Sequence, residues 1–219
     1  MTLISLDRET LDYDGEAVLR DISLSVQPGE TLVLIGESGV GKSTLLAHLY
    51  RLCAPAASLV PQELGLADQL SVFHNVYMGR LGHHSLWTNF KNLIWPTDPF
   101  LSDIRTILKD LHLEDKLRAR PTELSGGQRQ RVAIARAIYS QVDIVIADEP
   151  VSAMDMTLGT EVLRLLTARH ETSILALHDV DAALAIADRL IGLKDGTIAF
   201  DKAPDAISAG EIKDLYERR

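Results

Sequence analysis

The hydrophobic and polar positions of the chain first follow the period of a strand and then that of a helix. Apolar and polar residues alternate over Leu3–Asp7 and Ala17–Val26, which predicts an antiparallel pair of strands. Thr31–Ile35 (TLVLI) is continuously apolar, as in a buried strand, and it ends at Gly36. The next segment, Lys42–Leu52, carries leucines at helical spacing. A strand, a glycine loop and a helix therefore follow one another.

The middle of the chain has a looser, mainly helical pattern. Leu66–Phe100 has weak periodicity, and we interpret it as part of a helical lobe with irregular connections. Ser102 is expected to cap a helix whose apolar residues recur as far as Leu111. The other expected elements are helices over Arg129–Tyr139, Thr160–Arg169 and Val180–Asp188, strands over Val142–Ala147 and Ser173–Leu177, and a hairpin turn at Lys194–Gly196. This alternation predicts an α/β fold.

Composition and charge narrow the class of protein. Of 219 residues, 46% are apolar and 24% charged, as in globular proteins and unlike disordered or fibrous ones. A net charge of -9 argues against a broad grip on nucleic acid or acidic lipid, so we expect no nucleic-acid partner. The chain has one cysteine, Cys53, no signal-peptide pattern and no apolar run near the roughly 18–20 residues of a membrane span. We expect a cytoplasmic protein that reaches a membrane only through a partner.

The segment Gly36–Thr44 reads GESGVGKST, which fits the phosphate-binding loop of glycine, four residues, glycine, lysine and then serine or threonine. Glycines let the backbone N–H groups wrap around phosphate oxygens, and the following helix N-terminus adds a favourable dipole. Lys42 would neutralise β- and γ-phosphate charge, and the Ser43 hydroxyl would reach magnesium. A chance turn is the alternative, but the strand, loop and helix context favours phosphate binding.

Two adjacent carboxylates end the apolar run Asp143–Glu149 (DIVIADE). At the carboxyl end of a parallel strand, Asp148 would hold magnesium and Glu149 would polarise the water that attacks the γ-phosphate. Such residues could instead cap a helix. The phosphate loop earlier in the chain favours the catalytic interpretation.

Between these motifs, Leu124–Gln128 reads LSGGQ and precedes the helical run RQRVAIARAI. In this order the motifs resemble those of ATP-binding cassette (ABC) ATPases, with LSGGQ as the signature motif. A serine and two glycines at a helix start form an anion cradle. The resemblance implies that this cradle closes over the γ-phosphate held by a second subunit.

Four further positions are similar to family positions. Tyr13 resembles the aromatic that stacks on adenine, although an aromatic near a strand is as often a core residue. Gln62 resembles the glutamine that touches magnesium and the attacking water and relays nucleotide state to the membrane partner. Ser152–Asp155 (SAMD) resembles a loop that crosses the dimer interface, and His178 the switch histidine at the γ-phosphate.

The resemblance covers nearly the whole chain and implies one P-loop ABC-type domain over residues 1–219, with an antiparallel β portion and an inserted helical subdomain at about 63–135. Only 20 positions separate Lys42 from Gln62, about half the family's usual spacing, so part of the antiparallel lobe is expected to be missing. Adjacent His83 and His84 are a poor pair for one metal, and we expect them in a solvated or partner-facing loop.

The implied activity is ATP hydrolysis that energises an importer, and an exporter or membrane-remodelling ATPase is the alternative. Implied cofactors are ATP and Mg²⁺, and implied partners are a second ATPase subunit, permease subunits and a solute-binding protein, with the chain on the inner face of the cell membrane. Expected catalytic residues are Lys42, Gln62, Glu149 and His178, and expected metal ligands are Ser43, Gln62 and Asp148. The residues expected to bind nucleotide are Tyr13, Gly36, Glu37, Ser38, Gly39, Val40, Gly41, Lys42, Ser43, Thr44, Ser125, Gly126, Gly127, Gln128 and Asp155.

The segments Asn75–Trp87 and Ala182–Gly192 look most similar to ATPase subunits of phosphonate and phosphite importers, which implies a small phosphorus oxyanion or organophosphonate as cargo. We expect Phe73, Tyr77 and Trp87 to supply an apolar groove for the permease, with a helical-lobe core as the alternative.

Overall fold

The computed structural model describes residues 2–217, and its chain forms two compact units. The first unit comprises the described residues within 1–59, 143–149 and 170–219, and the second comprises residues 60–142 and 150–169. None of the helices formed by residues 2–217 is long and apolar enough to cross a bilayer.

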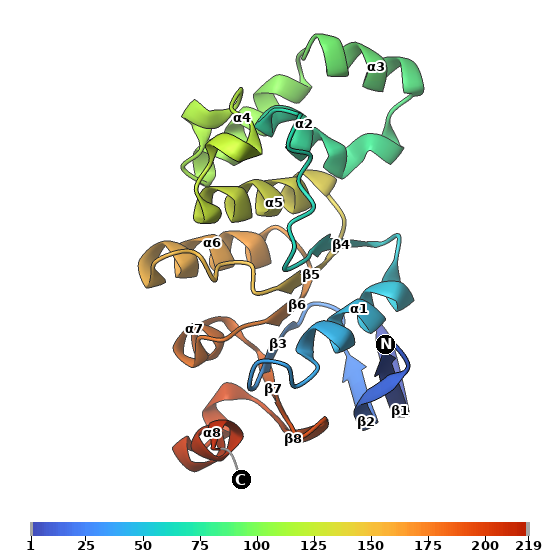
Figure 1. Ribbon diagram of the computed structural model, residues 1–219, viewed down its shortest axis with the longest axis vertical. Coiled ribbons are helices and arrows are strands. Elements are labelled where there is room, and N and C mark those ends of the chain that lie inside the picture. Colours follow the sequence, from blue (N-terminus) through green and yellow to red (C-terminus); the bar gives the residue numbers. More distant parts are fainter. Residues whose placement is uncertain (1, 218–219) are drawn as a thin grey trace. The chain divides into compact units, whose positions relative to one another are not determined.

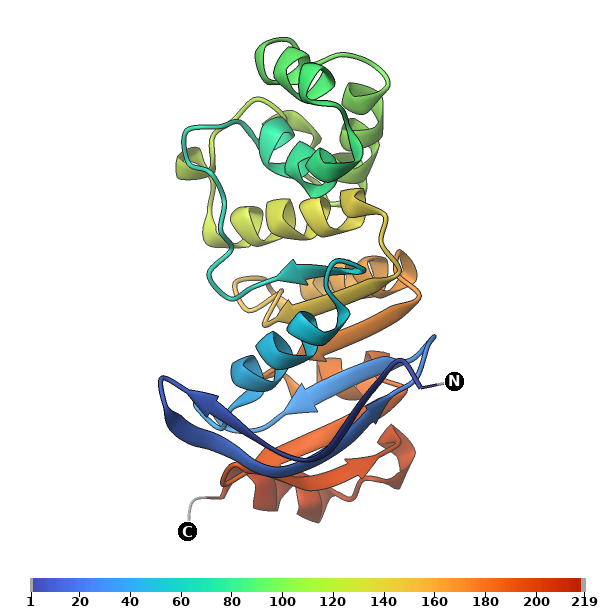
Figure 2. The same ribbon diagram turned by 90° about the vertical axis from the view of Figure 1, so that its right-hand side faces the viewer.

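The first unit begins with two long antiparallel strands, β1 (Ile4–Tyr13) and β2 (Glu16–Val26), drawn as the blue pair in Figure 2. They reverse at Asp14 and Gly15, which have φ angles of 51° and 83° and so give the left-handed backbone of a tight hairpin. Their alternating pattern buries one face, which includes Leu19. These two strands form a sheet of their own and confirm the predicted antiparallel start of the chain.

A six-stranded sheet forms the rest of this unit's framework, in the order β4-β5-β6-β3-β7-β8 (Figure 1). Strands β3, β5, β6 and β7 have buried central residues and pair in parallel, whereas β8 pairs antiparallel with β7. The strands are β3 (Thr31–Ile35), β4 (Ala57–Val60), β5 (Ile144–Asp148), β6 (Thr172–Ala176), β7 (Arg189–Lys194) and β8 (Thr197–Lys202). The accompanying helices are α1 (Lys42–Cys53), α7 (Val180–Ile186), η4 (Pro204–Ala206) and α8 (Ala209–Tyr216).

The second unit is helical. Its longest helix, α5, is packed by α2 and α4. The elements are α2 (Val72–Tyr77), η1 (Met78–His83), α3 (Leu86–Ile94), α4 (Phe100–Asp110), η2 (Glu114–Lys116), η3 (Pro121–Glu123), α5 (Gly126–Ser140) and α6 (Met156–Ala168). The predicted helical character of this region is therefore present, and the extent of the inserted subdomain at about 63–135 stays a prediction.

Two expectations for this unit are wrong. Ser102 does not cap a helix: α4 begins at Phe100, and the Ser102 hydroxyl donates back to the Pro99 carbonyl at 2.7 Å. Phe73 is only 2% exposed and packs in the core, so it does not line a docking groove as free surface. Tyr77 is 3% exposed and stacks on Phe73, but its side chain lines an apolar cavity of this unit. Trp87, the third aromatic of that prediction, is 74% exposed.

Candidate functional site

Three neighbouring parallel strands of the first unit end at one edge of the sheet. Leu34 of β3 and Asp148 of β5 both lie in register with Ala176 of β6. Beyond these positions the backbone N–H of Leu177 donates to the Leu34 carbonyl at 3.1 Å, and that of Glu149 donates to the Ala176 carbonyl at 3.0 Å. The phosphate loop, the paired carboxylates and the segment with His178 therefore leave the sheet side by side.

The phosphate loop depends on glycine at both of its ends. Gly36, Gly39 and Gly41 have φ angles of 150°, 81° and 108°, where residues with a Cβ are strained. A Cβ on Gly36 would lie 2.4 Å from the Leu193 carbonyl oxygen, and one on Gly41 would lie 2.8 Å from the Leu19 side chain. The loop can turn here only because these side chains are absent.

Lys42, the first residue of α1, reaches back across this loop. Its Nζ donates to the carbonyls of Gly36 at 2.8 Å and Glu37 at 3.0 Å, and the residue is only 5% exposed. Burial lowers the pKa of the Lys42 amine, while the charges of Glu149 and Asp148 act in the opposite direction. A cation is thus held at the centre of the loop within the electrostatic range of both carboxylates.

Asp148 and Glu149 differ in environment although they are adjacent. Asp148 is the last residue of β5 and is 7% exposed. Glu149 has a φ angle of 51°, a left-handed conformation that is strained for a residue other than glycine. Its Oε1 lies 2.5 Å from Nε2 of His178. The strand end thus presents one buried carboxylate and one carboxylate paired with an imidazole.

Asp148 also provides a test of whether the residues present suit Mg²⁺. Its Oδ1 is buried and accepts no hydrogen bond from residues 2–217, so a buried anionic oxygen has unused capacity for a cation or its bound water. Ser43 is exposed in the first turn of α1 and offers a hydroxyl oxygen. Magnesium is usually held by one or two such protein oxygens together with phosphate and water, so this donor set fits the ion.

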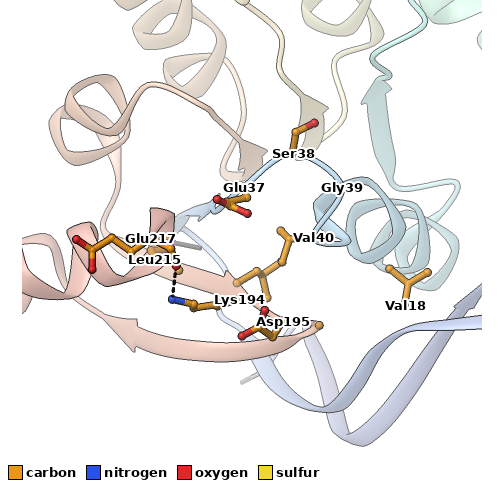
Figure 3. A pocket seen from close by; sticks show the side chains of 11 residues that line it. Val18, Glu37, Ser38, Gly39, Val40, Lys194, Asp195, Leu215 and Glu217 are labelled. Carbon is orange, nitrogen blue, oxygen red and sulfur yellow. Dashed lines mark hydrogen bonds between the residues drawn. The ribbon is translucent and has the colours of Figure 1, made fainter. Parts of the chain in front are cut away.

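Tyr13 ends β1, and its side chain is 66% exposed. The core alternative for this aromatic is therefore wrong, and the ring is accessible to a ligand. Figure 3 shows a separate cavity of about 460 Å³ bordered by Glu37–Val40 of the phosphate loop, by Val18, and by residues of the β7–β8 turn and α8. Lys194 in its wall donates to the Glu217 carbonyl at 3.2 Å and so ties the end of α8 to the turn.

The signature motif of the second unit forms the start of α5. Ser125 is its N-cap: the Ser125 hydroxyl accepts from the Gln128 backbone N–H at 3.3 Å, and the Gln128 side chain accepts from the Ser125 backbone N–H at 2.9 Å. This capping box fixes the first turn, where Gly126 and Gly127 contribute N–H groups without side chains. Asp155 similarly caps α6 by accepting from the Leu158 backbone N–H at 3.0 Å.

The first unit thus brings the phosphate loop, Lys42, Asp148, Glu149 and His178 to one sheet edge, whereas Gln62, the signature motif and Asp155 belong to the second unit. Gln62 is exposed in the segment after β4. His83 is exposed as expected, but His84 stacks on Tyr77 at 5.6 Å between ring centroids.

Sequence reasoning missed Gln130, a buried side chain of α5 that bonds to the SAMD loop. Its polar side chain within an otherwise apolar helical face was the only available signal.

Known proteins are similar to this chain over most of its length. A family model described as ABC transporter matches residues 19–152. The "Phosphonates import ATP-binding protein PhnC 2" of Haloarcula marismortui is 36% identical, with 98% of this chain and 89% of that protein covered. The "Phosphonates import ATP-binding protein PhnC 1" of Pseudomonas syringae pv. syringae is 38% identical, with 99% and 92% covered.

Solved structures agree with this match. An ABC transporter of metal-chelate type in an inward-facing conformation aligns with a TM-score of 0.80 and 26% identity, covering 99% of this chain and 89% of that one. A nucleotide-free ATP-binding cassette from an ABC transporter aligns with a TM-score of 0.71 and 23% identity, covering 98% and 95%. The predicted fold class, a P-loop ATPase with an antiparallel portion and a helical portion, is thereby confirmed. The chain belongs to the ABC transporter family, and it is one of the family's ATP-hydrolysing chains.

Proposed function

We propose that this ATPase powers an importer of phosphonate or a related small phosphorus oxyanion such as phosphite. The observation that carries the proposal is the similarity to phosphonate import ATP-binding proteins over 98–99% of the chain. The names of these relatives favour import over the export alternative. An ATPase subunit need not touch the cargo, so the cargo assignment rests on this similarity.

The residues at the sheet edge of the first unit would perform the hydrolysis. Lys42 and the backbone N–H groups of Gly36–Thr44 bind and orient the triphosphate. Glu149 accepts the proton of the attacking water, and the adjacent His178 holds that carboxylate in place and contacts the γ-phosphate. Tyr13, accessible at the end of β1, stacks on the adenine ring.

Magnesium would be held by Asp148 and Ser43, with Gln62 as a further ligand. When bound, the ion neutralises the charge that develops on the β- and γ-phosphates. Asp148 suits this role because its buried Oδ1 has no other partner within residues 2–217.

Each active site would be shared between two copies of the chain. The exposed N-cap Ser125 and the following glycines form a helix N-terminus that binds anions, and we assign it to the nucleotide of the second subunit together with Gln128 and Asp155. Hydrolysis would then require closure of the homodimer. Closure and opening would drive the permease between its two forms.

The helical unit would contact the permease. The chain would then lie on the inner face of the cell membrane, in a transporter that also includes a solute-binding protein. An apolar cavity of about 350 Å³ supports this assignment: Leu70, Met78, Leu81, Phe90 and Leu93 help to line it. Tyr77 lines the same cavity, and α3, which contributes Phe90 and Leu93 to it, also exposes Leu86 and Trp87 by 89% and 74%.

The test is uptake in a strain from which the gene has been deleted. The deletion strain should lose growth on phosphonate or on phosphite as sole phosphorus source and keep growth on inorganic phosphate. The wild-type gene should restore uptake, and the Glu149→Gln gene should not. Unchanged uptake of both phosphonate and phosphite in a strain without a redundant system would refute the cargo assignment and leave the ATPase activity untouched.

A further inference from the structure

Gln130 joins the signature helix to the SAMD loop (Ser152–Asp155). It lies in the second turn of α5 and is only 8% exposed. Its Nε2 donates to the Ser152 hydroxyl at 2.8 Å, and its Oε1 accepts from the Ala153 backbone N–H at 3.0 Å. The side-chain amide supplies both a donor and an acceptor, so one buried group holds two consecutive residues of the loop.

The first turn of the same helix lies directly against this loop. A Cβ on Gly127 would be 2.7 Å from the Ala153 carbonyl oxygen, and one on Gly126 would be 3.5 Å from the Ala153 Cβ. The glycines of the signature motif therefore permit close backbone packing in addition to any role with phosphate. At the far end of the loop, Asp155 is fixed by its cap on α6.

We propose that Gln130 is a positioning residue that makes the signature turn and the SAMD loop move as one rigid piece when the dimer closes. This inference rests on the shared active site proposed above, because both elements would face the second subunit. Gln130 touches neither nucleotide nor reacting atoms. It acts by holding Ser152 and Ala153 against the turn that presents Ser125.

A rigid connection changes the energetics of closure. If the loop were free, its residues would have to be ordered each time the dimer formed, and that entropy would weaken the closed state. ATP binding to a single chain would be unaffected, because it uses the phosphate loop of the first unit. Loss of Gln130 should therefore separate nucleotide binding from dimer closure.

The test uses Gln130→Met, which keeps the length of the side chain and removes both hydrogen bonds, in a Glu149→Gln background that holds ATP. Sedimentation velocity with ATP and magnesium measures the dissociation constant of the dimer. We expect it to rise about five- to thirtyfold, as for the loss of one or two buried hydrogen bonds. ATP affinity of the single chain should change by less than about twofold. In the chain with native Glu149, the substitution should lower kcat by a larger factor than it changes KM.

Gln130→Glu is the conservative control, because its carboxylate still accepts from Ala153 and the Ser152 hydroxyl can turn to donate to it. It should recover most of the dimerisation. Gln69→Met makes the same exchange at an exposed glutamine outside both motifs, and it should change nothing. Ser152→Ala removes one partner from the exposed loop, so it serves if Gln130→Met does not fold, and its effect should not add to that of Gln130→Met.

Two outcomes overturn the inference, and they are distinguishable. If the Glu149→Gln parent dimerises with ATP and Gln130→Met merely lowers the melting temperature, the contact is structural and only the positioning role fails. If the folded Glu149→Gln parent binds ATP and never dimerises, the shared active site itself fails, and the inference fails with it.

Discussion

Nε2 of His178 lies 2.5 Å from Oε1 of Glu149, although the two residues are 29 positions apart in the chain. Parallel pairing of β5 and β6 brings them together, and the Glu149 backbone N–H donates to the Ala176 carbonyl at 3.0 Å. A non-glycine residue at a φ of 51° costs about 1–3 kcal/mol, which the surrounding contacts must offset. The strained residue is the one whose carboxylate pairs with the imidazole.

This geometry predicts the behaviour of Glu149→Gln. The amide keeps the size of the side chain and cannot accept a proton from water, so turnover should fall by about a hundred- to ten-thousandfold. ATP should remain bound and hold two chains together, so size-exclusion chromatography with ATP and magnesium should show a dimer that the wild type forms only transiently. Normal hydrolysis by this variant would mean that Glu149 is not the base.

Lys42→Ala tests the cation at the centre of the phosphate loop. The substitution removes the amine that bonds to the Gly36 and Glu37 carbonyls, and with it the charge that would face the phosphates. ATP binding should weaken and turnover should stop. Bound ligand stabilises the folded state, so ATP should raise the melting temperature of the wild type more than that of the variant. Wild-type activity in the variant would contradict the role of the loop.

Much of this site could be predicted from the sequence because its determinants are local. Continuous apolar runs predicted β3, β5 and β6 to within two residues, and the glycine spacing of Gly36–Thr44 predicted the loop. Strand ends in a parallel sheet meet at one edge, so Glu149 and His178 could be expected to lie close together.

The remaining features depend on contacts between distant segments. The bond from Gln130 to Ser152 spans 22 residues, and no local pattern reports it. Helix α4 begins at Phe100 with Pro99 as its N-cap, so Ser102 lies within the first turn. A serine at that position resembles a cap when only the sequence is considered. The burial of Tyr77 follows from packing against Tyr139 of α5, which periodicity within a six-residue helix cannot reveal.

Ser125→Arg separates the two halves of the proposed shared site. Ser125 is exposed, and in our proposal it serves the nucleotide of the other chain. The single chain should therefore bind ATP normally, while the bulk of arginine blocks dimer closure in the Glu149→Gln background. Ser208→Arg is the matched control, because Ser208 is likewise the N-cap of a capping box, at α8. A folded Ser125→Arg chain that binds no ATP as a monomer would contradict the shared site.

Tyr13 should contribute to nucleotide affinity and not to stability. Its ring is 66% exposed, so Tyr13→Ala should leave the melting temperature without ATP nearly unchanged. Loss of stacking on adenine should weaken ATP binding by about 1–3 kcal/mol, as for other aromatic contacts with bases. Tyr13→Phe keeps the stacking face and should bind ATP as the wild type does. Equal affinity of the alanine and wild-type chains in equilibrium dialysis would exclude the stacking role.

A pair of glycines in η1 tests how tightly the helical unit packs around the signature helix. A Cβ on Gly79 would lie 2.3 Å from the Arg136 carbonyl oxygen of α5, whereas a Cβ on Gly82 would meet nothing within 4 Å. Gly79→Ala must therefore push η1 away from α5, and overpacking of this kind typically costs about 1–3 kcal/mol.

Gly82→Ala introduces the same methyl group three residues further on, where the backbone φ is not in the left-handed range. It should leave stability unchanged or raise it by about 0.4–1 kcal/mol, since alanine restricts the unfolded chain. Urea unfolding of the two variants measures both effects, and equal midpoints would contradict the close packing of η1 on α5. Because α5 also carries the signature turn, Gly79→Ala should weaken ATP-driven dimerisation in the Glu149→Gln background, and Gly82→Ala should not.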